Sequence, residues 1–215
     1  MPLYKTITVN PTTKVLIWKI EESLELLSED IELTNRSEIR VNGMKSELHQ
    51  RGYLSIRHLL ASEGYCDKDL WYDDNGKPHL TDGKHISISH SFNFSAIIIS
   101  DIEVGIDVEK KREKILKIAE KFTTFEDYQK LAHKEVIIRK LTIVWCAKES
   151  LYKSFARKGL TFLNHIYVED FSLYYNETSA KVNFQDKIET YHVWFHEFEG
   201  FTCAYALLNE RSKND

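Results

Sequence analysis

The sequence has little of several residue types that mark special classes of protein. Only 3 cysteines occur in 215 residues. These residues, Cys66, Cys146 and Cys203, are odd in number and widely spaced, which excludes a disulfide framework and the paired spacing of a zinc site. Just 3 prolines and 8 glycines interrupt the chain, and no low-complexity segment is present. Such cysteine usage suits a reducing compartment, so we expect the protein in the cytoplasm.

Long apolar runs and an excess of basic residues are also missing. The longest apolar runs, such as 96–99, are far too short to span a bilayer, and residues 1–11 lack the basic and apolar parts of a signal peptide. With 29 Lys and Arg against 33 Asp and Glu, the formal net charge is −4, which argues against a dedicated nucleic-acid binder. We therefore expect neither a membrane nor a nucleic acid as a partner.

The residues that are present make up an ordinary soluble composition, with 42% hydrophobic and 29% charged residues. A length of 215 residues is enough for one large domain or two small ones with real cores. Hydrophobic periodicity predicts strands and helices in both halves of the chain, and the two halves share a coarse layout. The predicted strands are 4–9, 14–20, 86–91, 94–100, 104–109, 166–175, 181–184, 191–197 and 202–208, and the predicted helices are 21–27, 46–60, 114–122 and 134–157.

The stretch Gly105-Ile-Asp-Val-Glu-Lys110 has the alternation of a β-strand. Side chains alternate along a strand, so Asp107 and Glu109 share one face while Ile106 and Val108 share the other. Two residues of strand separate the two carboxylates by roughly 6–7 Å at the backbone. Their oxygens can therefore converge on one hard cation.

The stretch Trp145-Cys-Ala-Lys-Glu-Ser-Leu-Tyr-Lys153 has the pattern of a helix. Trp145, Glu149 and Lys153 recur at i, i+4 and i+8 and fall on one face. A glutamate and a lysine on that face could complete a site for a metal ion and a phosphate, although alone they would only indicate a surface ion pair. Cys146, inside this stretch, is expected to be a small helix residue and not a nucleophile.

Together, the two stretches resemble the signature of the 4′-phosphopantetheinyl transferases of the larger, surfactin-synthetase-activating type. That family carries G-[IV]-D-[IV]-E, followed along the chain by [WF]-x-x-K-E-[SA]-x-x-K, and both strings are complete here. Three further strings are similar to family strings in the same order: GKPHL at 76–80, SISHS at 87–91 and KGLTF at 158–162. The resemblance spans residues 45 to 165 or so, and five strings in order are far more specific than any one alone.

This resemblance implies a fold, an activity and partners. The fold would be α+β, a pseudo-twofold duplication of a unit in which an antiparallel sheet packs against a long helix. Residues 1–102 would supply contacts to coenzyme A phosphates, and residues 103–215 would carry the metal and catalytic motifs. A monomer would transfer 4′-phosphopantetheine from coenzyme A to a serine hydroxyl of an apo acyl or peptidyl carrier protein, and release adenosine 3′,5′-bisphosphate.

The resemblance also assigns residues to coenzyme A. Many family members have an R-x-E-W-L-A-x-R-like string where this chain has QRGYLSIR at 50–57, which implies that Arg57 and Arg51 reach coenzyme A phosphates. Gly52 departs from the commoner string, which has a charged or larger residue there. The other implied contacts to coenzyme A come from residues in the matching strings, namely Lys77, Ser89, His90, Lys148 and Lys153.

The same matches imply how the reaction is assisted. Asp107, Glu109 and Glu149 would supply oxygen ligands, which select Mg²⁺ or Mn²⁺ over softer metals. Glu149 would take the serine proton, directly or through a metal-bound water, and Lys153 would stabilise charge on the pyrophosphate. Asp107, Glu149 and Lys153 are thus the expected catalytic residues, since phosphoryl-type transfer is helped mainly by positioning and charge neutralisation.

Residues 114–122 are expected to form a helix with an apolar stripe. Ile115, Ile118, Ala119 and Phe122 follow the spacing i, i+3, i+4 and i+7. The stripe either faces the core or, as the resemblance implies for this region, helps to dock the carrier protein.

Two alternatives to the transferase remain open from the sequence. Asp101, Glu109 and Lys111 loosely fit the D…E-x-K signature of a metal-dependent nuclease. That hypothesis leaves the strings at 87–91 and 145–153 unexplained and predicts a basic face that the composition lacks. A non-enzymatic module that binds coenzyme A or a carrier protein is the other alternative, and its expected mark is loss of a metal carboxylate or of the helix lysine.

Overall fold

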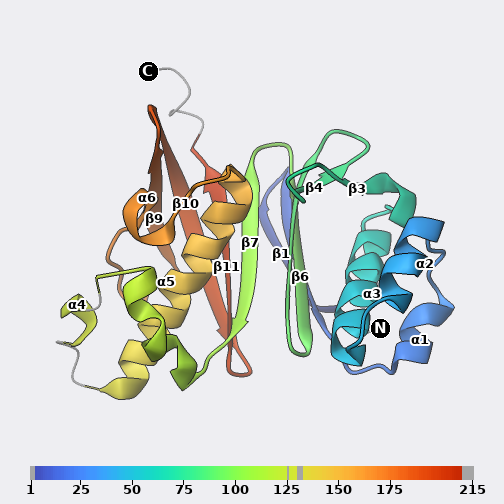
Figure 1. Ribbon diagram of the computed structural model, residues 1–215, viewed down its shortest axis with the longest axis horizontal. Coiled ribbons are helices and arrows are strands. Elements are labelled where there is room, and N and C mark those ends of the chain that lie inside the picture. Colours follow the sequence, from blue (N-terminus) through green and yellow to red (C-terminus); the bar gives the residue numbers. More distant parts are fainter. Residues whose placement is uncertain (1–2, 125, 130–132, 210–215) are drawn as a thin grey trace. The chain divides into compact units, whose positions relative to one another are not determined.

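The computed structural model describes residues 3–124, 126–129 and 133–209 (Figure 1). The chain divides into two compact units, Met1–Asp101 and Ile102–Asp215. Each unit contains one antiparallel sheet and one long helix, of 16 residues in the first unit and 22 in the second.

The N-terminal unit is built on a six-stranded sheet in which all neighbouring strands are antiparallel. In spatial order the strands are β1 (Leu3–Asn10), β2 (Thr13–Lys19), β6 (Phe94–Ser100), β5 (His85–Ser91), β4 (Pro78–Leu80) and β3 (Leu70–Tyr72). The helices are α1 (Leu24–Glu29), α2 (Asn35–Asn42), α3 (Glu47–Ser62) and a 3₁₀ turn, η1 (Asp67–Asp69).

Helix α3 closes the core of this unit. Its side chains Leu54, Leu59 and Leu60 are buried in one apolar cluster with Leu16 of β2 and Ile97 of β6. Full burial of each of these side chains contributes about 1.5–3 kcal/mol to the free energy of unfolding. The cluster therefore fixes α3 against the sheet, including the neighbouring strand β5.

The C-terminal unit has a five-stranded sheet, also antiparallel throughout. In spatial order the strands are β7 (Val104–Lys110), β11 (Phe201–Leu208), β10 (Lys187–Phe198), β9 (Glu177–Phe184) and β8 (Ile166–Val168). The helical elements are η2 (Glu113–Lys117), η3 (Ala119–Lys121), α4 (Glu126–Gln129), α5 (Lys134–Phe155) and α6 (Phe162–His165). Glu199 and Gly200 connect β10 to β11 with φ values of 44° and 78°, as the favoured hairpin turns require.

Helix α5 packs on β7 and β11 (Figure 1). Its buried residues Leu141, Val144 and Cys146 belong to one apolar cluster, and Ala147 and Leu151 belong to a second. Because both clusters lie under the same helix, α5 is held against the sheet along most of its length.

The helix expected at 114–122 is wrong in type, because the segment forms the two 3₁₀ turns η2 and η3. Ile115, Ala119 and Phe122 nevertheless lie in the core cluster under α5. Their spacing of three to four residues suits a 3₁₀ turn almost as well as an α-helix, so the apolar pattern does not separate the two. The buried members of the stripe are core residues.

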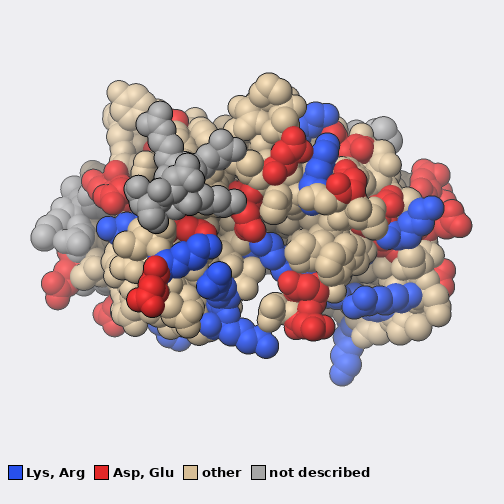
Figure 2. Space-filling view, turned by 90° about the horizontal axis from the view of Figure 1, so that it is seen from above, with Lys and Arg blue, Asp and Glu red and all other residues tan. Residues whose placement is uncertain are grey.

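The fold class expected from the sequence is confirmed, since each unit is an antiparallel sheet covered by a long helix. Within the described residues, none of the helices combines the length and the apolar composition needed to cross a membrane. Acidic and basic side chains are interspersed over the face of the molecule in Figure 2. This mixed surface agrees with the small net charge of −4.

Candidate active site

The acidic strand β7 carries Asp107 and Glu109 on one face. The strand pairs with β11, and Asp107 lies opposite Ala204 while Glu109 lies opposite Thr202. Asp107 is buried, with 5% of its surface exposed, and Glu109 is half-buried. A buried carboxylate is costly unless it is paired, so the partners of Asp107 decide what this strand can do.

Lys153 of α5 is the partner of Asp107. Its ammonium nitrogen lies 2.8 Å from Oδ1 of Asp107 and donates a second hydrogen bond, of 3.1 Å, to the carbonyl oxygen of Ile106. The helical spacing of the second motif thus brings a lysine to the acidic strand. A charge-assisted pair of this kind is stronger than a neutral hydrogen bond.

Gly105 allows α5 to come this close to β7. A Cβ atom placed on Gly105 would lie 1.8 Å from the carbonyl oxygen of Ser150 and 3.2 Å from Cβ of Ser154. No side chain fits in that space, so glycine is required for packing at this position. The glycine of the first motif therefore sets the distance between the strand that carries Asp107 and the helix that carries Lys153.

Glu149 has a pKa raised to about 7. The first cause is burial, which disfavours the charged form, and the second is the negative charge of Asp107. Lys153 opposes this rise, and Glu109 adds a smaller contribution to it. The three carboxyl groups therefore interact electrostatically, and Glu149 is poised to exchange a proton near neutral pH.

The acid cluster of Asp107, Glu109 and Glu149 offers only oxygen donors, the kind that Mg²⁺ and Mn²⁺ prefer. In the part of the chain that the structure describes, no group of three or more His, Cys, Asp or Glu side chains has the arrangement of a metal site. Instead, Asp107 is engaged by Lys153. The chemistry of the donor set fits a hard cation, because a divalent ion would offset the repulsion that raises the pKa of Glu149.

Cys146 lies next to this cluster in the sequence but is fully buried. Burial, together with the charges of Asp107 and Glu109, raises the pKa of its thiol well above the ordinary value. A thiol that stays protonated is a poor nucleophile. Cys146 instead packs in the apolar cluster on the buried side of α5.

Lys148 is also buried, on a neighbouring face of α5. Its ammonium group donates to the main-chain carbonyl oxygens of Phe122 and, at 2.8 Å, Phe162. Burial lowers the pKa of Lys148 to about 8. These contacts tie α5 to η3 and α6, and they give no support to the implied phosphate contact.

In the N-terminal unit, a cavity of about 300 Å³ lies between α3 and β5. His90 lines it from β5 and Gly52 from α3. A Cβ atom on Gly52 would lie 2.8 Å from Cδ2 of His90, so the glycine leaves room for the imidazole ring. The departure from the commoner family string thus has a physical role here.

Ser89 and His90 point to opposite faces of the sheet, as neighbours on a strand must. Ser89 is buried and is not among the residues that line the cavity, whereas His90 is exposed and lines it. Lys77 is half-buried, and its backbone N–H donates to the carboxylate of Asp73 in the turn before β4. The structure therefore brings only His90 of these three residues to the cavity.

Arg57 forms a buried ion pair with Asp67, with 2.9 Å between Nε and Oδ1. It also donates to the hydroxyl of Tyr53. Hydrogen bonds from Thr34, Ser37 and Arg57 hold the pKa of Asp67 below its ordinary value even though burial acts in the opposite direction. Arg57 also lines the cavity that His90 lines, so its guanidinium group lies at that cavity and already has an ionic partner in Asp67.

Arg51 donates to the carbonyl oxygen of Ile20 at 3.3 Å. Its Nε atom is buried and has no hydrogen-bond partner among the described residues. Nothing in these contacts brings Arg51 to the cavity.

Two residues that the sequence patterns missed lie at the same cavity as His90. Arg40 sits over the rings of Tyr53 and Tyr72, at 5.6 and 5.5 Å from the ring centroids. His49 meets His90 edge-on, with ring centroids 6.0 Å apart. Because Arg40 lies in a polar stretch without clear periodicity, only the tertiary structure reveals its place.

Comparison with known proteins supplies an independent finding. A family model described as the 4′-phosphopantetheinyl transferase superfamily matches residues 103–206. The 4′-phosphopantetheinyl transferase gsp of Aneurinibacillus migulanus is 32% identical over 163 residues, which cover 73% of this chain and 67% of that protein. The 4′-phosphopantetheinyl transferase ffp of Bacillus subtilis is 28% identical over 150 residues, 66% of each chain. The matched region contains the whole acid cluster and Lys153.

Proposed function

Because the chain belongs to the 4′-phosphopantetheinyl transferase superfamily, we propose that it transfers 4′-phosphopantetheine from coenzyme A to a serine of an apo carrier protein. The serine oxygen attacks the β-phosphorus of coenzyme A and forms a new phosphodiester bond. The bond between that phosphorus and the bridging pyrophosphate oxygen breaks, and adenosine 3′,5′-bisphosphate leaves. The proton of the serine hydroxyl must pass to a base.

The observation that carries this proposal is the environment of Glu149. Its carboxyl group has a pKa of about 7, beside Asp107 and Lys153. A base with a pKa near the working pH is both available in its charged form and able to accept a proton. We therefore assign the serine proton to Glu149.

Lys153 has a second proposed task. It stabilises negative charge that develops on the pyrophosphate, and its hydrogen bond to the carbonyl oxygen of Ile106 fixes its position. Its pair with Asp107 orients the ammonium group before substrate arrives.

We propose that Asp107, Glu109 and Glu149 hold a magnesium ion, for which manganese can substitute. A bound ion of this kind supplies positive charge that offsets the charges of the pyrophosphate. The support is the oxygen-only donor set and the mutual repulsion that contributes to the raised pKa of Glu149. Removal of the ion with EDTA should abolish activity, and Mg²⁺ or Mn²⁺ should restore it.

For the N-terminal unit, we propose that Lys77 and His90 contact phosphates of coenzyme A. His90 is supported by its exposed position at a cavity that also contains the cation of Arg40. Lys77 rests on its match to the family string alone. We propose a phosphate contact for Arg57 as well, because it lines the same cavity. The hydrogen bonds of Arg51 and Lys148 to main-chain carbonyl oxygens, and the burial of Ser89, lend less support to their implied contacts with coenzyme A.

The remaining proposals concern partners and setting. We propose an acyl or peptidyl carrier protein as the acceptor, no membrane or nucleic acid as a partner, and a monomer as the active form. The net charge of −4 supports the absence of nucleic acid. The odd number and wide spacing of the cysteines Cys66, Cys146 and Cys203 support a reducing cytoplasm.

The proposal is tested by intact-mass spectrometry of purified apo carrier proteins after incubation with the enzyme, coenzyme A and Mg²⁺. The carrier should gain the mass of one phosphopantetheine group, and a carrier whose acceptor serine is changed to alanine should gain none. An unchanged mass for fatty-acid, polyketide and peptide-synthetase carriers alike would contradict the proposal and favour a module that only binds.

A further inference from the structure

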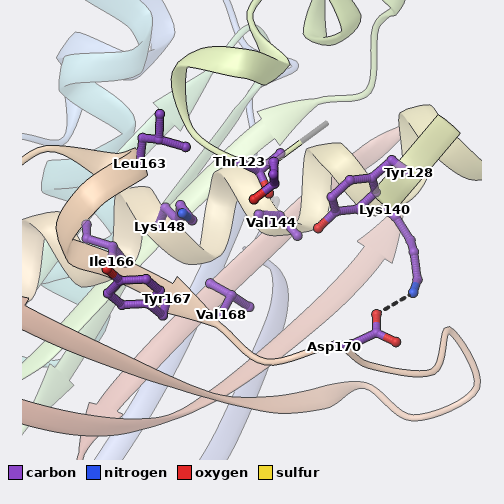
Figure 3. A pocket seen from close by; sticks show the side chains of 11 residues that line it. Thr123, Tyr128, Lys140, Val144, Lys148, Leu163, Ile166, Tyr167, Val168 and Asp170 are labelled. Atoms are coloured by element: carbon purple, nitrogen blue, oxygen red, sulfur yellow. Dashed lines mark hydrogen bonds and ion pairs between the residues drawn. The ribbon is translucent and has the colours of Figure 1, made fainter. Parts of the chain in front are cut away.

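A cavity of about 500 Å³ lies beside α5 in the C-terminal unit (Figure 3). Its volume is within the roughly 300–1,000 Å³ typical of small-molecule sites. One wall is the face of α5 that carries Lys140, Val144 and Lys148. The other walls come from the segment around Thr123, from α4, and from α6 and β8. Figure 3 shows these side chains grouped around a common space.

The charges in these walls do not balance. Lys140 is neutralised by Asp170, with 2.7 Å between Nζ and Oδ1, the contact drawn as a dashed line in Figure 3. Within residues 3–124, 126–129 and 133–209, the hydrogen-bond partners of Lys148 are the carbonyl oxygens of Phe122 and Phe162 alone. Among the residues that the structure describes, no carboxylate pairs with it. One buried positive charge is therefore left without a counter-charge.

Burial of an ammonium group without a counter-charge costs free energy. Carbonyl oxygens satisfy two of its three N–H donors but bring no negative charge. Removing an ion from water is repaid only when an opposite charge and good hydrogen bonds replace the solvent. The wall of this cavity thus favours a ligand that carries the missing negative charge and accepts the third hydrogen bond.

The rest of the lining specifies the body of such a ligand. Val144, Leu163, Ile166 and Val168 present apolar side chains to the cavity. An inorganic ion would leave these surfaces in contact with water, whereas an apolar chain would bury them, which is favourable.

We propose that this cavity binds a small organic acid, whose carboxylate pairs with Lys148 and whose apolar body lies against Val144 and Val168. The proposal goes beyond the transferase activity and does not depend on it, because binding requires neither coenzyme A nor a metal ion. A failure of one proposal therefore leaves the other standing.

Calorimetric titration of the full chain with octanoate, compared with octanamide, tests the proposal. The two probes share the same apolar chain, but only octanoate carries a charge. Octanoate should bind at least about tenfold more tightly, as expected for a hydrogen-bonded charge pair. Equal affinities, or no binding of octanoate at millimolar concentration, would overturn the proposal.

Three variants place the site. Lys148→Met should remove the preference for octanoate, while Lys140→Gln, at the cation that Asp170 already neutralises, should keep it. Val168→Phe should weaken both probes because the ring fills the cavity, and it keeps the test decisive if Lys148→Met does not fold. Thermal unfolding of each variant serves as the control for folding. Octanoate binding that Val168→Phe leaves unchanged would show that this cavity is not the site.

Discussion

Replacement of Gly105 by alanine tests how the two motifs are held together. The added Cβ would start 1.8 Å from the carbonyl oxygen of Ser150, whereas real Cβ contacts essentially never fall below 3.0 Å. The strand and the helix must therefore separate by at least about 1.2 Å at this point. A misplacement of about 1 Å in a catalytic site can cost about 10²-fold in rate.

We expect Gly105→Ala to lower kcat about 100-fold, and the overpacked core to lose about 1–3 kcal/mol of stability. Steady-state kinetics with coenzyme A and a carrier protein measure the first effect, and thermal unfolding measures the second. Gly43→Ala is the matched control, since its φ of −78° is ordinary and its nearest neighbour would be 3.3 Å away. If the Gly105→Ala enzyme had near-normal kcat and stability, the close packing at Gly105 would not be what aligns Asp107 with Lys153.

Four further predictions follow from the site. Glu149→Gln should lower kcat by about 10²–10³ at saturating coenzyme A, with the KM for the carrier unchanged; near-normal turnover would remove Glu149 as the base. His90→Ala and Lys77→Ala should mainly raise the KM for coenzyme A, and a loss of kcat at saturation would make His90 the better candidate for the base. Gly52→Ala should also raise this KM, because its Cβ displaces the ring of His90; an unchanged KM would argue against a contact by His90. Finally, the pKa of Glu149 is about 7 in the folded, metal-free protein, against 4.5 for an ordinary glutamate. Between these two pH values the folded protein keeps a proton that the unfolded chain has lost. The contribution of Glu149 to the free energy of unfolding therefore falls as the pH rises through about 7. Mg²⁺ should therefore raise the melting temperature more at pH 7.5 than at pH 5.5, and Glu149→Gln should abolish that difference.

The local part of the site follows from periodicity. Alternation along β7 places Asp107 and Glu109 on one face, and helical spacing places Glu149 and Lys153 on another. Alternation also requires Ser89 and His90 to face opposite sides of β5, so a shared contact for the pair conflicts with the strand that carries them. The resemblance joined these residues to one function, but only the packing around Gly105 explains how the two motifs meet.

The contacts between residues of different helices and turns do not follow from any pattern in the sequence. Arg57 is paired with Asp67, ten positions further along, from a separate 3₁₀ turn. No periodicity links the two positions, so the sequence does not predict this ion pair, and the resemblance implied only a phosphate contact for Arg57. Lys148 is similar, because its partners are main-chain carbonyl oxygens, which every residue carries. Pairing and burial of this kind depend on the fold as a whole.

In the proposed reaction, the β-phosphorus of coenzyme A passes to a serine of a carrier protein. The most direct measurement counts both products of one reaction, the modified carrier by intact mass and adenosine 3′,5′-bisphosphate by chromatography. We expect the two to appear in a one-to-one ratio with Mg²⁺, and neither to appear with Glu149→Gln on the same timescale. Adenosine 3′,5′-bisphosphate without modified carrier would indicate hydrolysis of coenzyme A and would contradict the transfer.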